Sequence, residues 1–367
     1  MTRLRLIADD LTGTLDTAAG FTGLCGSIPV AWPEILAAES AGCLAIDSGT
    51  RERSAEAAGR IVGALAPRLV GAGIAFKKVD SLLRGPWAAE LAAVLRQGAW
   101  DRCVVAPAFP YQGRRTEAGC QLARRGGGWE PVSGDIAEAL RAAGLPARRA
   151  SVADGPVAGV AVYDAASDAD LARVADLGGA DPVLWCGSGG LAAALARGAD
   201  APGDDRLAGP VLGLFGSDRP ETAAQLAACG GHHLVLSPQD PDHAGAVAAR
   251  LDRHGVALAS LALPEGIARE AAAARIAAAF AGVIDRIPQP GTLLVAGGET
   301  LKALCLALGV TRLDVTGQII PGLPRSTLRG GRWDGLAVVS KSGAFGTEGV
   351  WRDLLHGNGF PPERSDA

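Results

Sequence analysis

Charged residues follow four short apolar stretches in the first half of the chain. The stretches are LRLIA, GCLAI, IAFKKV and RCVVAPAF, and after them come Asp9 and Asp10, Asp47 through Arg51, Asp80 through Arg84, and Arg114. A guanidinium binds a carboxylate as a two-pronged fork, and a carboxylate can anchor a hydroxyl or accept its proton. Four such groups in one half of the chain predict a site for a small hydroxylated acid.

The predicted roles differ within this set. The candidate substrate-binding residues are Asp9, Asp16, Arg51, Lys78, Ser81, Arg84 and Arg114, and the candidate catalytic residues are Asp10 and Asp80. Asp80 stands between two cations that would lower its pKa, so it suits anchoring, whereas Asp10 has no cation beside it in sequence and is the predicted base. Because successive strand residues face opposite ways, at most one of Asp9 and Asp10 is expected to reach the same point. An Asp in such a place is also often just a helix cap, and Asp16 also fits the surface.

Three glycine-rich turns in the second half favour phosphate binding. They are FGSDRPET (215–222), AGGETLKAL (296–304) and SKSGAFGTEG (340–349), and each follows an apolar stretch. Exposed backbone N–H groups at helix N-termini can cradle phosphate oxygens. One such turn indicates only a tight connection, but three in one half favour a nucleotide-phosphate site.

A fourth glycine-rich turn, GSGGLA (187–192), matches a dinucleotide-binding pattern. That pattern needs a second strand ending in an acid about 20 residues later, and here this region is a stretch rich in Asp, Gly and Pro. Close packing of a helix on a strand is the favoured role of these glycines. An NAD-dependent oxidoreductase of a hydroxy acid remains an alternative function.

The elements that must position these residues are alternating strands and helices. This alternation predicts an α/β fold of two domains, each a mostly parallel sheet flanked by helices, with a cleft between them. In such sheets, ligands bind beyond the carboxyl ends of the strands, where the charged residues stand. The stretch 197–210 predicts the boundary between a substrate domain (1–200) and a nucleotide domain (208–356), and 357–367 is expected to be a disordered tail.

Composition narrows the function classes. The 367 residues carry a net charge of −4 without a Lys/Arg run, which argues against a nucleic-acid partner. No membrane span and no leader are expected, so the predicted location is the cytoplasm. The seven cysteines and five histidines show no metal-ligand spacing, and no protein-held metal is expected.

Six motifs together resemble the four-carbon acid sugar kinase family. They are ADDLTG, KKVDSLLRG, APAFPYQGRRT, GSGGL, AGGET and SKSGAFG, in that order. The resemblance implies phosphorylation of a tetronate or 3-oxo-tetronate by ATP with Mg²⁺, the acid on the first domain and the nucleotide on the second. It places the ATP contacts on Ser217, Gly297, Gly298, Glu299, Thr300 and Gly343.

The chain departs from this family as a divergent member. Leu82 stands where the family has Thr, Arg219 where it has a second Ser, and the region 120–150 is shortened. The expected function is therefore an ATP-dependent kinase of a small sugar acid, with the particular acid left open. A non-catalytic small-acid sensor is a third alternative, and the oligomeric state, homo-oligomer included, is not given by the sequence.

Overall fold

The chain divides into two compact units, Met1–Ala201 and Pro202–Ala367. The computed structural model describes residues 3–36, 42–179, 182–199, 201–240 and 242–361. The residues just after the division belong structurally to the second unit, because the Gln318 N–H donates to the Pro202 carbonyl and Arg325 pairs with Asp204. Most of the stretch between the two predicted domains is therefore packed onto unit 2.

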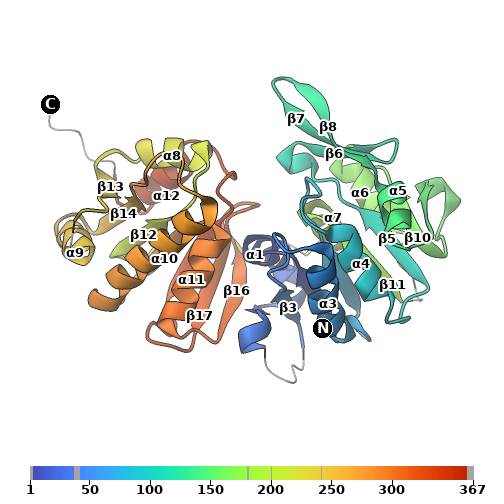
Figure 1. Cartoon of the computed structure of the whole chain (residues 1–367), viewed down its shortest axis with the longest axis horizontal. Coiled ribbons are helices and arrows are strands. Elements are labelled where there is room, and N and C mark those ends of the chain that lie inside the picture. Colours follow the sequence, from blue (N-terminus) through green and yellow to red (C-terminus); the bar gives the residue numbers. More distant parts are fainter. Residues whose placement is uncertain (1–2, 37–41, 180–181, 200, 241, 362–367) are drawn as a thin grey trace. The chain divides into compact units, whose positions relative to one another are not determined.

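The main sheet of unit 1 is parallel throughout (Figure 1). Its strands are β1 (Leu4–Ala8), β2 (Ile28–Ala31), β3 (Leu44–Asp47), β4 (Ile74–Lys78), β5 (Arg102–Ala106), β9 (Ala147–Ala150), β10 (Gly159–Tyr163) and β11 (Val183–Gly187). They lie in the order β2-β3-β1-β4-β11-β5-β10-β9. The central strands are buried on both faces, which explains their nearly continuous apolar sequences.

Helices cover both faces of this sheet. They are α1 (Leu11–Gly20), α2 (Thr22–Cys25), α3 (Ala55–Leu65), α4 (Trp87–Leu95), α5 (Ile136–Ala142), α6 (Asp168–Ala175) and α7 (Gly189–Leu195). On one face α3, α4 and α5 bury Val62, Leu91 and Leu140 against the strands. Helices α1, α6 and α7 pack together in a second layer. Short 3₁₀ turns lie at Pro33–Ile35, Ala66–Leu69, Pro110–Gln112 and Val152–Asp154.

A separate antiparallel sheet lies between β5 and α5 along the chain. It consists of β6 (Arg114–Glu117), β7 (Cys120–Arg125) and β8 (Gly128–Asp135), in that order. The β7–β8 hairpin projects from the rest of unit 1 (Figure 1). The sequence analysis did not predict this sheet, because its polar strands lack the buried apolar pattern of the main sheet.

Unit 2 has the same layered design with a mixed sheet. Its strands are β12 (Val211–Phe215), β13 (His233–Leu236), β14 (Val256–Leu261), β15 (Thr292–Ala296), β16 (Arg312–Gln318), β17 (Pro324–Arg329) and β18 (Ala337–Lys341). In the order β13-β14-β12-β15-β18-β17-β16 the first five strands are parallel, and β17 runs antiparallel to both of its neighbours, β18 and β16. The helices are α8 (Pro220–Ala227), α9 (His243–His254), α10 (Arg269–Arg286), α11 (Gly298–Leu308) and α12 (Val350–Gly357), with a 3₁₀ turn at Gly230–His232. The prediction of two α/β units with mostly parallel sheets is confirmed.

The end of the chain differs from the expected disordered tail. Asn358 accepts from the Leu207 N–H at 2.7 Å and donates to the Asp205 carbonyl at 2.8 Å, and Phe360 packs against the core of unit 2. These contacts order the segment through Pro361, and residues 362–367 lie outside the described part of the chain. None of the helices in the described ranges is long and apolar enough to cross a membrane.

Candidate active site

Arg51 gathers three carboxylates at the carboxyl ends of β1, β3 and β4. Its Nε and Nη2 both bind Asp9, the second at 2.8 Å. The same Nη2 donates to Asp10 Oδ1 at 2.8 Å, and Nη1 lies 3.7 Å from Asp80 Oδ1. The parallel sheet therefore brings acids from two strand ends to one guanidinium, as the strand-end rule predicts.

One expectation about Asp10 is wrong. Asp9 and Asp10 reach the same point, because Arg51 Nη2 donates to a carboxylate oxygen of each at 2.8 Å. Asp10 also has a cation in space, although none stands beside it in sequence. It is at the same time the N-cap of α1, accepting from the Gly13 N–H at 3.0 Å and the Thr12 hydroxyl at 2.8 Å. The capping role and a role in the site therefore coexist in one residue.

Asp80 is the most fully occupied of the three acids. Arg84 binds it with Nε at 2.6 Å and Nη2 at 2.9 Å, and the Leu82 and Arg84 N–H groups donate to it as well. Burial opposes its ionisation, but the bonds from Arg84 and the charge of Arg51 hold its pKa well below the usual range. A carboxylate in this state is a poor proton acceptor and a rigid anchor.

The same balance acts on Asp9 and Arg51. Burial raises the pKa of Asp9, yet the charge and hydrogen bonds of Arg51 outweigh this and lower it. For Arg51 burial acts against the charge, and Asp10 and Asp9 raise its pKa above its ordinary value. Both groups are therefore ionised across the whole physiological pH range.

Two cations of the predicted set have no acid partner within the described chain, Lys78 and Arg114. Lys78 is buried and its Nζ donates to the Val79 carbonyl at 2.8 Å. Arg114 is half-buried and its Nη1 donates to the Gly113 carbonyl at 3.1 Å, while its Nε is buried without a partner. Burial lowers the pKa of Arg114, and Asp80 acts in the opposite sense. These two groups retain capacity for an added anion.

A buried ion pair beneath the site escaped the sequence analysis. Lys77 Nζ lies 2.8 Å from Glu90 Oε2 of α4, and both side chains are fully buried. Lys77 also donates to the Lys78 carbonyl at 2.8 Å, so its ammonium group links the end of β4 to α4. Alternation placed Lys77 on the opposite face from Lys78, but no pattern linked it to an acid 13 residues later.

The predicted Ser81 is tied to the antiparallel sheet by a second missed residue, Gln121. The fully buried Gln121 donates to the Ser81 carbonyl at 2.8 Å and to the Pro107 carbonyl at 3.2 Å, and accepts from Thr116 at 2.7 Å. Asp16 is half-buried on α1, close to Gly189: a Cβ there would lie 3.3 Å from Asp16 Oδ2.

In unit 2 the three predicted glycine-rich turns converge. A Cβ at Gly343 would lie 1.9 Å from Ser217 Oγ, so the first and third turns touch. The Gly297 N–H donates to the Lys341 carbonyl at 3.0 Å, which joins the second turn to the third. Thr300 is buried with its Oγ1 against the Gly216 and Gly297 backbone. The helices α8 and α11 thus begin at one junction.

Two other predicted ATP residues occupy the same helix start. Gly298 is the first residue of α11. Glu299 is exposed and forms a 2.9 Å ion pair with Arg269 of α10, so its carboxylate is directed along the helix surface. The predicted set is therefore together in the fold, with Glu299 at its rim.

The glycines of GSGGLA serve packing. A Cβ at Gly187 would lie 2.5 Å from the Ala106 carbonyl oxygen, and one at Gly190 would lie 2.5 Å from that of Ala108. Ser188 caps α7 and donates to the same Ala108 carbonyl at 2.8 Å. Because the turn is pressed against β5 and its loop, the dinucleotide alternative loses its structural basis.

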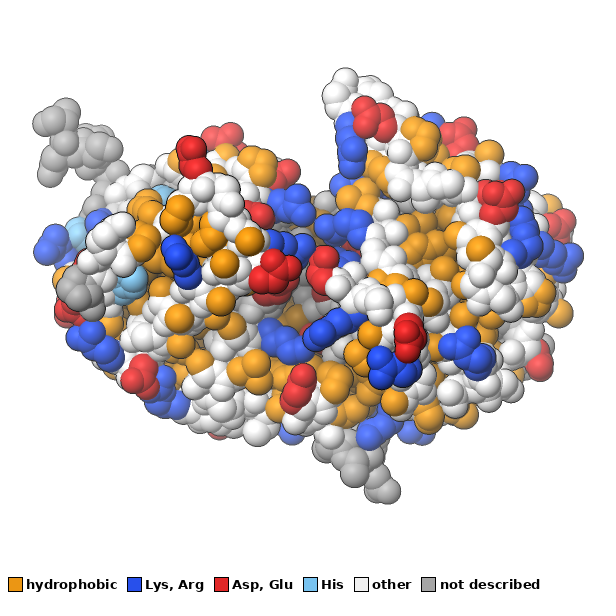
Figure 2. Space-filling model, viewed as in Figure 1, with side chains coloured by type: hydrophobic (Ala, Val, Ile, Leu, Met, Phe, Trp, Pro, Cys, Tyr) orange, Lys and Arg blue, Asp and Glu red, His pale blue; other side chains and the backbone are white. Residues whose placement is uncertain are grey.

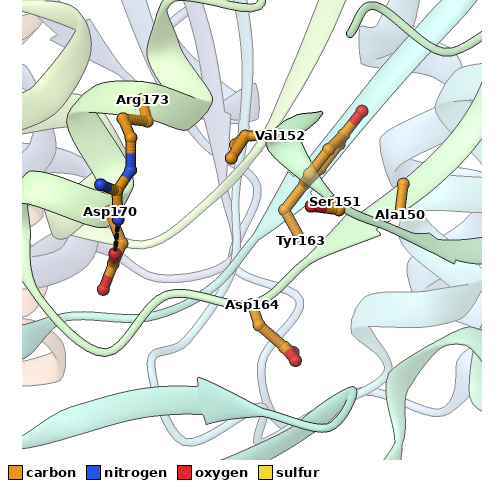
Figure 3. A pocket seen from close by; sticks show the side chains of 7 residues that line it. All are labelled: Ala150, Ser151, Val152, Tyr163, Asp164, Asp170 and Arg173. Carbon is orange, nitrogen blue, oxygen red and sulfur yellow. Dashed lines mark hydrogen bonds and ion pairs between the residues drawn. The ribbon is translucent and has the colours of Figure 1, made fainter. Parts of the chain in front are cut away.

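A small hollow of about 190 Å³ lies at the far edge of the unit 1 sheet, beyond β9 and β10 (Figure 3). It is lined by Ala150, Ser151, Val152, Tyr163, Asp164, Asp170 and Arg173. Asp170 is engaged by Arg173 and by the Ser167 cap of α6, and Asp164 accepts from the Gly119 N–H. No predicted site residue lines it, and its polar groups already serve local structure.

The face of the molecule in Figure 2 carries charges of both signs on each unit. On the face in Figure 2, basic and acidic side chains are interspersed with apolar ones across each unit. The network around Arg51, by contrast, is largely buried, and the Arg51 side chain is only 13% exposed.

Two family models match the chain. Residues 4–135 match a sugar-binding N-terminal domain, and residues 212–350 match a nucleotide-binding C-terminal domain. The D-threonate kinases of Cupriavidus necator and Bordetella bronchiseptica are 33% and 32% identical, each over 94% of this chain and 95% of their own length. A 3-oxo-tetronate kinase of Pseudomonas fluorescens is 32% identical over 56% of this chain and 54% of its own.

Solved structures share the fold. A Haemophilus influenzae protein has a TM-score of 0.73 at 21% identity, covering 96% of this chain and 99% of that one. A Salmonella typhimurium protein has a TM-score of 0.76 at 21% identity, covering 96% and 98%. With the sequence relatives, these findings define a two-domain sugar-acid kinase. The chain belongs to the four-carbon acid sugar kinase family.

Proposed function

We propose that the chain transfers the γ-phosphate of ATP to a hydroxyl of a four-carbon sugar acid. The observation that carries this proposal is the convergence of the three glycine-rich turns, with Gly343 in contact with Ser217 and the Gly297 N–H bound to Lys341. Close backbone approach and two helix N-termini favour phosphate groups. Unit 2 is accordingly the proposed nucleotide site, and unit 1 the proposed site of the acid.

The carboxylate of the substrate is proposed to bind Arg114 and Lys78. Arg51 and Arg84 are already neutralised by Asp9, Asp10 and Asp80, so they serve better as a rigid frame. A buried cation without an acid gains most from an added carboxylate. This division of roles refines the predicted anion pocket, in which all four cations acted alike.

Asp10 is the proposed proton acceptor and Asp80 the proposed anchor of a sugar hydroxyl. The Asp10 side chain is 27% exposed, against 9% for Asp80, so it is the acid of the network more open to a substrate. Asp80 has its pKa held too low to take a proton. Asp9, Asp16 and Ser81 remain proposed substrate-binding residues.

Mg²⁺ is the proposed companion of ATP, where it would bridge phosphates and neutralise charge in the transfer. No group of three or more His, Cys, Asp or Glu side chains within the described chain is arranged to hold a metal ion. Mg²⁺ usually keeps several waters and binds through substrate phosphates, so the residues present fit an ion delivered with the nucleotide.

The proposed substrate is a tetronate of the threonate type. The D-threonate kinases match almost the whole chain, whereas the 3-oxo-tetronate kinase matches about half of it. A screen of C4 to C6 sugar acids with a coupled ADP assay tests this choice. Turnover of a four-carbon acid is expected, and turnover confined to longer acids would contradict it.

Gly343→Ala tests the nucleotide site. The added Cβ would collide with Ser217, so the turns must separate, and we expect KM for ATP to rise at least about tenfold while binding of the acid is retained. The control is Gly282→Ala on α10, where a Cβ meets nothing within 4 Å and should leave KM unchanged. Unchanged ATP affinity in Gly343→Ala would show that the nucleotide binds elsewhere.

A further inference from the structure

The end of β18 holds a buried lysine that no functional role yet explains. Lys341 is 1% exposed, and its Nζ donates to the Ser342 carbonyl at 3.0 Å and the Gly343 carbonyl at 2.9 Å. No carboxylate pairs with it in the described part of the chain. A buried ammonium without an acid is costly, and a methionine would fill similar space at lower cost. A functional role for the charge would explain why a lysine occupies this position.

Lys341 sits where the three glycine-rich turns meet. Its carbonyl accepts from the Gly297 N–H of the second turn, and its Nζ holds Gly343 of the third. Gly343 in turn lies against Ser217 of the first. Thr222 of α8 donates to the same Gly343 carbonyl at 2.9 Å, so two donors draw that carbonyl inward.

Drawing these carbonyls inward fixes the direction of the neighbouring N–H groups. In a planar trans peptide the N–H points opposite to the carbonyl of the preceding residue. With the Ser342 and Gly343 carbonyls turned toward Nζ, the Gly343 and Ala344 N–H groups are turned away from it. Neither of these N–H groups donates to another group among the described residues. Successive free N–H groups of this kind form an anion-binding concavity.

We propose that Lys341 is a positioning residue of the nucleotide-phosphate site, which shapes this concavity with its hydrogen bonds and supplies a positive charge behind it. The inference rests on the proposed function of unit 2. It assigns to Lys341 a part beyond the contacts implied by the family, namely to orient the backbone donors that would meet the phosphate.

The surroundings of Lys341 disfavour its charged form as long as no anion is bound. Burial lowers its pKa to about 8, and Glu221 of α8 acts in the opposite sense. The other charged groups on the facing elements are Arg219 before α8 and Glu299 on α11, which is paired with Arg269. A bound phosphate would favour the charged lysine, so nucleotide binding above pH 8 should take up a proton from the buffer onto Nζ.

Calorimetric titration of the whole protein with MgADP tests this inference. At pH 8.5, in two buffers of different ionisation enthalpy, the wild-type protein should show proton uptake. Lys341→Met should bind MgADP at least about tenfold more weakly, as expected for a lost charge-assisted bond, and without that uptake. In kinetics its KM for ATP should rise by a similar factor, with KM for the acid changed less than about twofold.

Thr222→Val is the matched variant. It removes the other donor to the Gly343 carbonyl without removing a charge, so binding should weaken by a smaller factor and proton uptake should persist. Lys341→Gln keeps a neutral donor and should recover part of the affinity but none of the uptake. A Lys341→Met protein with unchanged KM and unchanged uptake overturns the inference.

The wild-type protein provides an independent check if the Lys341 variants fail to fold. Its MgADP affinity should fall about tenfold from pH 7 to pH 9, as the lysine loses its proton in the free protein. A flat profile overturns the inference even where nucleotide binding is strong. Absence of MgADP and MgATP binding to the wild-type protein would instead refute the proposed nucleotide site, and this inference with it.

Discussion

The two proposed anion sites, at the strand ends of unit 1 and of unit 2, are built in opposite ways. In unit 1, Arg51 is held by Asp9 and Asp10, and Arg84 by Asp80, so fixed charges neutralise one another. In unit 2 the converging turns consist mainly of glycine and small polar residues, and the buried Lys341 faces backbone carbonyls. The first site is a rigid ionic frame, and the second is a set of backbone donors.

The two buried lysines make the difference clear. Burial works against the charge of both, but Glu90 and Asp9 raise the pKa of Lys77, whereas the pKa of Lys341 is lowered to about 8. Lys77 is therefore part of the folded frame, with its counter-ion built in. No acid pairs with Lys341 among the residues that the structure describes, as expected if the anion of the proposed site comes from a ligand.

The largest expected effect comes from Asp10→Asn. Asn caps a helix about as well as Asp, so α1 should persist while the proton acceptor is lost. We expect kcat to fall about 10²- to 10⁴-fold with little change in ATP binding, measured by steady-state kinetics. Near-normal kcat in this variant, with kcat lost in Asp80→Asn, would mean that the two roles are reversed.

Lys77→Met should destabilise unit 1 by about 3–5 kcal/mol, because it leaves Glu90 as a buried, unpaired charge. The double variant Lys77→Met/Glu90→Leu should recover most of this loss in urea denaturation. Lys341→Met is the comparison in unit 2. It should lower the free energy of unfolding far less, because it leaves no buried acid unpaired. Equal losses in Lys77→Met and Lys341→Met would erase the proposed difference between the units.

Arg114→Gln should raise KM for the sugar acid by roughly 10- to 100-fold, the range expected for a lost charge-assisted bond. Arg84→Lys breaks a two-pronged contact and should raise KM for the acid more than KM for ATP, but by less than Arg114→Gln, because Arg84 is already bound to Asp80. A larger effect at Arg84 than at Arg114 would indicate that the substrate carboxylate binds Arg84 and not Arg114.

The smallest effect is a difference in the pH dependence of stability. The folded pKa values of Asp9 and Asp80 lie below the unfolded value of about 3.9, so their contribution is present above that pH and is lost in more acidic solution. The folded pKa of Lys341, about 8, lies below the unfolded value of about 10.4. Between these two values the unfolded chain binds more protons, so stability should rise with pH.

Urea denaturation of the wild-type protein and Lys341→Met from pH 7.5 to 10 separates this contribution from those of other groups. The free energy of unfolding of the wild-type protein minus that of Lys341→Met should increase as pH rises. The reason is that deprotonation of Lys341 removes a buried charge from the folded wild-type protein. A constant difference between the two proteins would show that Lys341 has the same pKa in both states.

The parallel framework could be predicted because its strands are buried on both faces. Strands β1, β4 and β11 have apolar sequences that end where a charged or glycine-rich turn begins, and both signals are local. The polar sheet β6–β8 gives no such signal, and its pairing depends on contacts with the loops it covers. Strand β9, with the sequence ARRA, was missed for the same reason.

The parts of the candidate site that could be predicted are those that depend only on a residue's position at the end of a strand. The rule that placed Lys78 at a strand end applies equally to Lys341 in SKSG, so that residue was within reach of the sequence. Glu90 and Gln121 were not, because their partners come from other elements and depend on how α4 and β7 pack. The correction at Asp10 has the same origin, because Arg51, which bonds both Asp9 and Asp10, comes from the loop after another strand, β3.

The hydrogen bonds of Gln121 distinguish the base of the β7–β8 hairpin from its tip. The base is fastened to the loops that follow β4 and β5 through the Ser81 and Pro107 carbonyls, and the Arg124 N–H donates to the Gly113 carbonyl at 2.9 Å. At the tip, a side chain added at Gly126 or Gly127 would meet nothing within 4 Å. Insertions or deletions at the tip are therefore expected to leave the strand ends of unit 1 unchanged. The tip can then vary in length independently of the proposed site for the acid.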